Sequence, residues 1–136
     1  MLLVVWVTDW QMECCGAPFA VGEAVSWRLS NRPDVEWLST VIGVDEARAV
    51  THAEDHHDTQ PHGVRVVDGT VVRIRVARCR YVPGPKREWI PVTGSTSFEN
   101  VTFADGSEAD NYVGGDASQQ SQTLMTGYIV DLNVGA

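Results

Sequence analysis

The sequence predicts a mainly β domain (β-rich α+β), a small bent-sheet or barrel-like fold into which one short helical hairpin is inserted. Three observations support this prediction. Apolar and polar residues alternate with a period of two in several stretches, and Gly and Pro separate these stretches. A helical spacing of apolar residues is confined to about residues 33–57. With 136 residues, the chain has the length of one ordinary domain, so we expect residues 1–136 to form a single domain.

Two strands are expected before the helices. Residues 2–8 are apolar on both faces, which is typical of a central strand that is buried from both sides. The second strand lies in residues 19–29, where Val25, Trp27 and Leu29 occupy alternate positions. The Gly and Pro residues between these two stretches predict a turn.

Two short helices are expected next. The cluster at residues 31–34 favours a helix start, apolar residues follow at helical spacing, and Gly43 favours the end of that helix. A second helix is expected to begin at Asp45, which is a good N-cap residue. The apolar spacing carries this second helix through Ala53 toward residues 56–57.

A hairpin and a bent strand are expected after the helices. Asp68-Gly69 is a signal for a type I′ turn, so residues 64–71 are predicted to form a β-hairpin. In the strand that follows, the apolar positions change phase, and one continuous strand cannot bury both sets against a single core. The first set is Val72, Ile74 and Val76, and the second is Ala77, Cys79 and Tyr81. We therefore expect a bulge or a sharp bend near Val76-Ala77.

The C-terminal third is expected to hold two strands around a loop. Residues 88–92 contain a proline that restricts them to an edge strand. Residues 93–126 are rich in Ser, Gly, Asp, Asn and Gln, so we expect a long flexible loop with one weak strand at 99–104. Residues 128–134 alternate regularly and predict a last strand that fixes the C-terminus in the sheet.

Composition and charge restrict the class of partner. Ten Lys and Arg stand against eighteen Asp and Glu, which gives a formal net charge of -8. Long-range repulsion therefore disfavours nucleic acid and anionic membranes as partners. The N-terminus lacks the features of a secretory signal, and no apolar stretch approaches the ~20 residues of a membrane span. We expect a cytoplasmic protein whose cysteines are reduced.

Cysteine and histidine form the first pattern that can carry chemistry. His52 and His56 are four residues apart, so on a helix they share one face and can hold the same divalent ion. Cys79 and one of the adjacent pair Cys14 and Cys15, which we assign as Cys15, complete a tetrahedral set for a structural zinc ion. The other interpretation is that the histidines favour the negative end of a helix, while the cysteines are small buried side chains.

An enzyme that uses a metal or a thiol is the alternative function. A thiolate at Cys15 beside a histidine can support nucleophilic chemistry. However, Ala53 follows His52 at the position where the metallopeptidase pattern requires Glu. The sequence therefore favours a protein that is not an enzyme.

Basic residues form the second pattern, because seven of the ten Lys and Arg fall within residues 65–87. Two pairs, Arg73 with Arg75 and Arg78 with Arg80, are expected to point away from the core as a stripe of guanidinium groups. Such a stripe can bind nucleic acid or an acidic partner. It can also pair with the protein's own carboxylates, ten of which lie upstream of this segment. The net charge favours this second interpretation.

Several segments of the chain also carry a likeness to a family. They are residues 9–27 with the signature Trp-Gln-Met-Glu-Cys-Cys-Gly, the pair at 56–57, residues 69–81 and residues 127–132. Together they resemble a family of short, uncharacterised actinobacterial proteins that is classed as a domain of unknown function. The resemblance implies a free-standing bacterial domain with no assigned activity.

The sequence as a whole favours a cytoplasmic binding or regulatory module, with a protein or a small molecule as its partner and zinc as its one expected cofactor. The metal- or thiol-dependent enzyme is the alternative. A nucleic-acid-associated module that binds through the arginine pairs is the third interpretation. Five tryptophans can either line a ligand cleft or fill the core of a small β domain.

Overall fold

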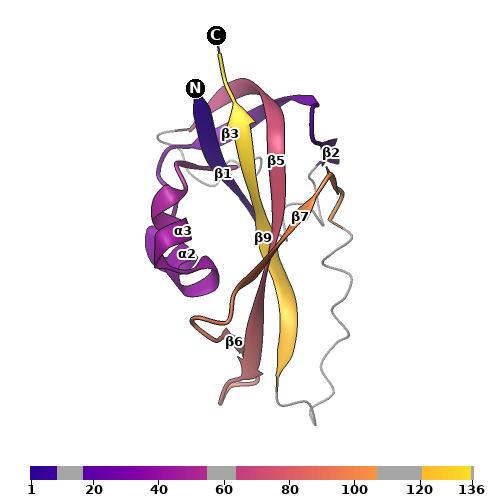
Figure 1. Cartoon of the computed structure of the whole chain (residues 1–136). Coiled ribbons are helices and arrows are strands. Elements are labelled where there is room, and N and C mark those ends of the chain that lie inside the picture. The colour runs from indigo at the N-terminus through magenta and orange to yellow at the C-terminus, as the bar shows by residue number, and fades with distance from the viewer. Residues whose placement is uncertain (9–16, 55–63, 107–120, 136) are drawn as a thin grey trace.

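The computed structural model describes residues 1–8, 17–54, 64–106 and 121–135, and this part of the chain is mainly β, as the sequence predicts (Figure 1). The elements in chain order are β1 (Leu2–Thr8), β2 (Phe19–Ala20), β3 (Ala24–Ser30), α2 (Val35–Ile42), α3 (Val44–Ala49), β4 (His52–Glu54), β5 (Val64–Pro83), β6 (Trp89–Pro91), β7 (Ser97–Val101), β8 (Phe103–Ala104) and β9 (Gln122–Asn133).

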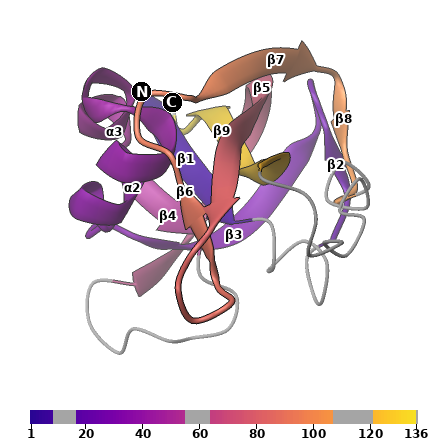
Figure 2. The same ribbon diagram turned by 90° about the horizontal axis from the view of Figure 1, so that it is seen from below.

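Five of these strands pair into a closed ring. Around the ring, β1 pairs with β9, β9 with β5, β5 with β3 and β3 with β4, all antiparallel, and β4 pairs with β1 in parallel. Figure 2 shows α2 and α3 on one side of this arrangement and the small β2–β8 sheet on the other. The long strand β5 extends beyond the ring, where β6 and β7 pair with it.

The sheet buries apolar side chains on both of its faces. Inside the ring, Val5 and Val7 of β1 pack in a core with side chains of β3, β5 and β9. On the outer face, Trp6 packs beneath α2 and α3 in a second cluster with Leu38 and Ile129. Successive residues of β1 therefore serve two different cores, which confirms the prediction of a central strand buried from both sides.

The first helix has the predicted bounds. The Asp34 side chain accepts a hydrogen bond from the backbone N–H of Trp37 at 3.0 Å, as an N-cap should. The helix ends before Gly43, which has a φ of 90°. This positive φ favours glycine over residues with a side chain.

The predicted N-cap and extent of the second helix are both wrong, since Gly43, and not Asp45, is the N-cap of α3. Helix α3 ends at Ala49, Val50 is already extended, and residues 52–54 form the strand β4. Strand β4 lies between β1 and β3, and the backbone N–H of Thr51 donates to the carbonyl of Val4 at 2.8 Å. This pairing to distant strands ends the helix where the local spacing would have continued it, and Val50 and Thr51 are β-branched.

The predicted hairpin at Asp68-Gly69 is also wrong, because β5 runs without interruption from Val64 to Pro83. A Cβ atom on Gly69 would lie 2.7 Å from Cγ of Leu132 in the neighbouring strand β9. The glycine is therefore required for the close approach of two strands, not for a turn.

A register shift does occur near Val76-Ala77, between Ala77 and Arg78, but the extra residue is Thr126 of β9, and β5 itself pairs regularly with β7 at this point. The change of apolar phase has a further cause, however. Val76 lies in the core inside the ring, whereas Ala77 lies in the cluster beneath the helices. Ile74 and Val76 are therefore buried against a different core from Ala77, and Val72 is exposed.

The C-terminal third combines confirmed and untested predictions. β6 is an edge strand that carries Pro91, as predicted. β9 is the last strand of the chain, and its pairing with β1 and β5 fixes the C-terminal segment in the sheet, as predicted. Two short strands, β7 and β8, stand in place of the one weak strand predicted at 99–104, and β9 begins at Gln122. Residues 107–120 lie outside the described residues, so the long flexible loop and the single-domain organisation stay predictions. No helix among the described residues has the length and apolar character to cross a lipid bilayer.

Candidate functional site

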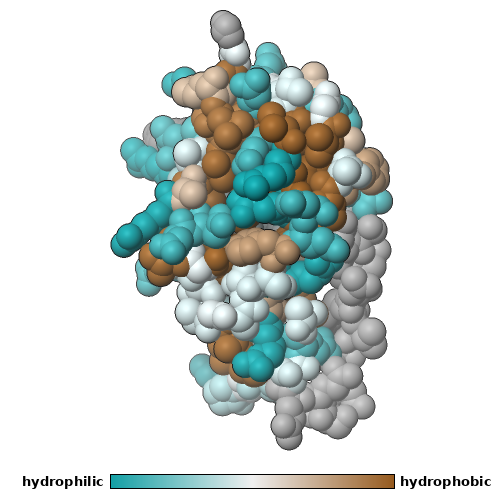
Figure 3. Space-filling model, viewed as in Figure 1, coloured by the Kyte–Doolittle hydropathy of each residue, from teal (hydrophilic) through white to brown (hydrophobic). Residues whose placement is uncertain are grey.

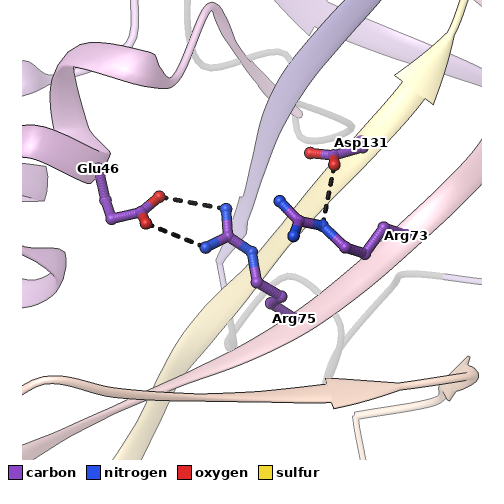
Figure 4. Close-up of polar contacts among 4 residues, drawn as sticks. All are labelled: Glu46, Arg73, Arg75 and Asp131. Atoms are coloured by element: carbon purple, nitrogen blue, oxygen red, sulfur yellow. Dashed lines mark hydrogen bonds and ion pairs between the residues drawn. The ribbon is translucent and has the colours of Figure 1, made fainter.

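The outer face of the β1–β9–β5 part of the sheet carries four charged side chains in two ion pairs (Figure 4). On β5, Arg73 donates from Nε to Oδ2 of Asp131 on β9 at 3.0 Å. Arg75, also on β5, donates from both terminal nitrogens to the two carboxylate oxygens of Glu46 on α3, each at 3.1 Å. The first pair joins two strands, and the second joins the sheet to a helix.

A bulge in β5 determines how Arg73 is presented. Val71 and Ile74 are both buried in the core inside the ring, so the two residues between them both lie outside that core. The pairing with β9 shifts its register at this point, which identifies Val72 as the extra residue. Val72 is 50% exposed and the Arg73 side chain is 48% exposed. The bulge therefore places an apolar and a cationic side chain together on the surface.

One hydrogen bond fixes the orientation of the Arg73 side chain and involves only one of its three nitrogens. Its partner Asp131 is only 12% exposed in its side chain, so the carboxylate is a rigid acceptor within the sheet. Only Nε of Arg73 donates to a residue of the described segments, which leaves the two terminal nitrogens able to bind something else. A guanidinium group held in this way can donate two parallel hydrogen bonds to a carboxylate.

Arg75 is placed differently, because its side chain is only 13% exposed. Its guanidinium group lies 5.3 Å from the centre of the Phe98 ring, in addition to its two bonds to Glu46. Glu46 belongs to α3 and Phe98 belongs to β7, so Arg75 on β5 contacts both of these elements. Arg75 therefore serves to hold α3 against the sheet.

Apolar side chains surround the charged group. Val4 of β1 is paired with Asp131, and Asp131 with Arg73, so these residues form one row across three strands. Leu2 lies on the same face of β1 as Val4, and it is exposed, as is Val72. Figure 3 shows hydrophobic side chains around a hydrophilic group on this face. A mixed surface of this kind is typical of sites that bind other molecules.

The other predicted arginine pair does not continue this surface. β5 pairs with β7 without a register shift, so Arg78 and Arg80 lie on the opposite face of the strand from Arg73 and Arg75. Arg78 donates to Glu99 at 3.0 Å, while Arg80 is exposed and forms no ion pair with a described residue. The four arginines therefore form no single stripe, and three of them are paired with the protein's own carboxylates.

The structure does not bring together the two predicted zinc ligands that it describes. His52 is paired with Val5, which in turn is paired with Val130 of β9, whereas Cys79 is paired with Leu124 of β9. These two positions of β9 are six residues apart, which corresponds to about 20 Å along a strand. One zinc ion, with bonds of about 2.0–2.3 Å, cannot join both side chains.

The other half of the predicted set, His56 and Cys15, lies outside the described residues together with Cys14. The helix that was expected to align His52 with His56 is not formed at His52, which belongs to β4. In the described segments, no three His, Cys, Asp or Glu side chains are grouped so that they could hold a metal ion.

Cys79 has the surroundings of a core thiol. It is fully buried, and its Sγ lies 3.3 Å from Oγ of Ser95 and 3.6 Å from the carbonyl oxygen of Val92. The same Ser95 hydroxyl donates to that carbonyl at 2.6 Å and accepts from the backbone N–H of Arg80 at 2.9 Å. The thiol is thus part of the contacts that hold the turn after β6 against β5.

Sequence reasoning did not single out Asp131, Glu46 or Leu2 as functional residues, and it wrongly grouped Val72 with Ile74 and Val76 on one apolar face. A signal existed for Asp131, because it is the one charged residue within the apolar run that forms the end of β9. A carboxylate at that place must either point away from the core or find a cationic partner. Glu46 gave no such signal, since an acidic residue in a first helical turn is ordinary. Val72 alternates with Ile74 and Val76 in the sequence, and only the bulge moves it out of their face.

The comparisons with known proteins identify a family but no individual relative. No curated protein and no solved structure matches the chain. A family model described as a family of unknown function (DUF6578) matches residues 1–134. The actinobacterial origin and the N-terminal signature expected from the sequence stay predictions. Because the match covers almost the whole chain, the protein belongs to this family of unknown function, DUF6578.

Proposed function

We propose that the protein is a binding or regulatory module that holds a partner protein against the outer face of β1, β9 and β5. The observation that carries this proposal is the state of Arg73. Its side chain is half exposed and is fixed at Nε by the nearly buried Asp131. Val72 is its exposed neighbour in the chain, and the exposed Leu2 lies on the same outer face of the sheet. The partner segment is expected to offer a carboxylate flanked by apolar side chains.

The physical argument is one of preorganisation. A long side chain normally loses conformational entropy when it becomes part of an interface, at a cost of about 0.5–1.5 kcal/mol. The hydrogen bond to Asp131 already restricts Arg73, so less entropy remains to be lost on binding. Arginine surrounded by apolar side chains is also a frequent centre of binding energy in protein interfaces.

The same contacts favour binding over the other two interpretations. The carboxylates of Asp131 and Glu46 are each engaged by an arginine, which disfavours their use as general bases. Three of the four arginines expected to contact nucleic acid are paired within the protein. With a net charge of -8, binding of a polyanion would have to overcome both effects.

A photo-crosslinking amino acid placed at position 72 tests the proposal. In a lysate of the source cells, a discrete cross-linked product is expected from position 72 and not from position 66, where Val66 of the same strand is 62% exposed. Arg73→Lys keeps the charge but removes the planar fork, so it should weaken the product from position 72. The purified partner should then compete for the same product.

Two results would contradict this proposal. One is the same set of products from positions 66 and 72, which would indicate contact without specificity. The other is a product from position 72 that Arg73→Lys and Arg73→Ala leave unchanged, because the arginine would then play no part in recognition.

A structural zinc ion remains a separate proposal that rests on the sequence of Cys15 and His56. Elemental analysis of protein purified without an affinity tag tests it directly. If zinc is bound, its amount should fall in Cys15→Ser and remain unchanged in Cys79→Ala, since Cys79 lies far from His52. A zinc content near zero in the unaltered protein would exclude the site.

A further inference from the structure

We propose that the turn between β5 and β6 is a second docking site, which takes an acidic protein segment through Arg80, Lys86 and Arg87. This basic turn follows the C-terminal end of β5 (Figure 1), whereas the bulge at Val72 lies eleven residues before Pro83, near the middle of the strand. It is therefore independent of the function proposed above, and either proposal can fail without the other.

The first support is the local sign of the charge. Between the end of the buried part of β5 and the end of β6, three cationic side chains accompany a single carboxylate, that of Glu88. Arg80, Lys86 and Arg87 are all exposed, and none of them forms an ion pair within the described segments. The whole chain has a net charge of -8, so this end of the hairpin differs in the sign of its charge from the rest of the molecule.

The second support is the geometry of the turn (Figure 2). The backbone N–H of Gly84 donates to the carbonyl of Glu88 at 2.7 Å, and that of Arg87 donates to the carbonyl of Gly84 at 3.3 Å. A Cβ atom on Gly84 would collide with the Glu88 carboxylate, so this carboxylate lies over the glycine, inside the turn. Glu88 is exposed, and its carboxylate lies beside this glycine and the side chain of Ile90.

Arg87 adds a conformational argument. It has a φ of 65° and is the one residue other than glycine with a positive φ in the described part of the chain. A side chain in the left-handed region destabilises the backbone relative to glycine, so Arg87 stands at a strained position of the turn, and strained positions are frequent at binding sites.

The positive charge of the turn and the apolar side chain of Ile90 indicate which kind of segment would bind there. Val82 is paired with Ile90, so Arg80 lies on the same face of the hairpin as the exposed side chain of Ile90. Cations beside an apolar side chain complement a short acidic segment that carries an apolar residue. A nucleic acid would bring its phosphate charges close to the acidic remainder of the molecule, which makes it the less favourable polyanion.

Fluorescence anisotropy with a labelled peptide of glutamates around one leucine tests this inference on the whole chain. At low salt the peptide should bind, and the affinity should fall as salt is added. The double variant Lys86→Glu/Arg87→Glu should bind about tenfold more weakly or worse. The matched control Arg32→Glu/Arg48→Glu has the same net charge and alters exposed cations elsewhere, so it should retain the affinity of the unaltered protein.

Arg87→Gly separates binding from folding. Glycine relieves the backbone at this position, so the variant should be at least as stable as the unaltered protein and yet bind the peptide more weakly. Equal losses in the two double variants would overturn the proposal, since only total charge would matter. An absence of peptide binding at low salt would overturn it, and so would tighter binding of a single-stranded DNA of about ten nucleotides.

Discussion

Gly127 shows how a single residue without a side chain allows the two central strands to pack. A Cβ atom at this position would lie 2.5 Å from the carbonyl oxygen of Val7 and 2.7 Å from the ring of Trp6. Both neighbours belong to β1, and the Trp6 ring is itself buried beneath the helices. Neither the backbone nor the enclosed ring can move away easily, so a methyl group has no room.

We therefore expect Gly127→Ala to lower the free energy of unfolding by about 1–3 kcal/mol, the usual cost of overpacking a core. Urea unfolding followed by circular dichroism would measure the change. Val66→Ala, at an exposed position of β5, is the control and should change the stability by less than about 0.5 kcal/mol. If Gly127→Ala is as stable as the unaltered protein, the close packing of Trp6 on β9 is not as described.

His52 makes stability depend on pH. Burial, and then the positive charge of Arg65, lower the pKa of His52 below its usual value of 6.5. The unfolded chain therefore takes up a proton at a higher pH than the folded protein does. The contribution of this residue to stability is complete above about pH 6.5 and is lost as the pH falls toward the lowered pKa.

His52→Gln should remove this part of the pH dependence. The stability of both proteins is measured by thermal unfolding between about pH 5 and 8. Titration of the carboxylates affects both proteins equally, so it cancels in the difference. The difference in stability between them should change as the pH falls through this range. If the two curves stay parallel, His52 ionises equally in the folded and unfolded states.

At the scale of elements, local patterns predicted those strands and helices whose ends depend on their own residues. β1, α2 and β9 were predicted because their apolar spacing and caps are contained within them. α3 and β4 were not separated, because the end of α3 depends on pairing of β4 with β1 and β3. The Asp68-Gly69 pair was interpreted as a turn, since the neighbour that requires Gly69, Leu132, is distant in the sequence.

The candidate site, too, could be predicted only where it depends on local sequence patterns. Arg73 and Arg75 were predicted to lie outside the core, because they alternate with apolar residues. Their partners Asp131 and Glu46 are 58 and 29 residues away in the chain, so no local spacing could connect them. The exposure of Val72 also depends on a bulge that only the pairing with β9 reveals.

The ion pair between Glu46 and Arg75 connects the helical hairpin to the sheet, and its removal should be costly. Glu46→Ala leaves the largely buried guanidinium group of Arg75 without its carboxylate, and we expect a loss of about 1–3 kcal/mol in the free energy of unfolding. The control is Glu99→Ala, because Glu99 pairs with Arg78 in a more exposed position. This control should lose about 0–1 kcal/mol.

Urea unfolding of the two variants measures how much stability each substitution removes. A loss in Glu46→Ala that is no larger than the loss in Glu99→Ala would contradict the view that Arg75 holds α3 on the sheet. A double-mutant cycle with Arg75→Ala would then show whether the two residues interact at all.

At the scale of the whole molecule, the distribution of charge determines how stability responds to salt. The acidic residues of the N-terminal half and the arginines of β5 neutralise one another only in part, and a formal charge of -8 remains. Exposed like charges repel one another in the compact state, and salt screens this repulsion beyond a Debye length of about 10 Å at 0.1 M. The largely buried pair of Arg75 with Glu46 is screened much less.

We therefore expect the thermal unfolding midpoint to rise as sodium chloride is increased from about 0.01 M to about 0.3 M at pH 7. Differential scanning calorimetry would measure it. The variant Arg32→Glu/Arg48→Glu carries more negative charge without touching either ion pair of the outer face, so its midpoint should be lower at low salt and should rise more steeply. A midpoint that falls with salt would contradict this expectation, because it would mean that attraction between opposite charges outweighs the repulsion that the net charge implies.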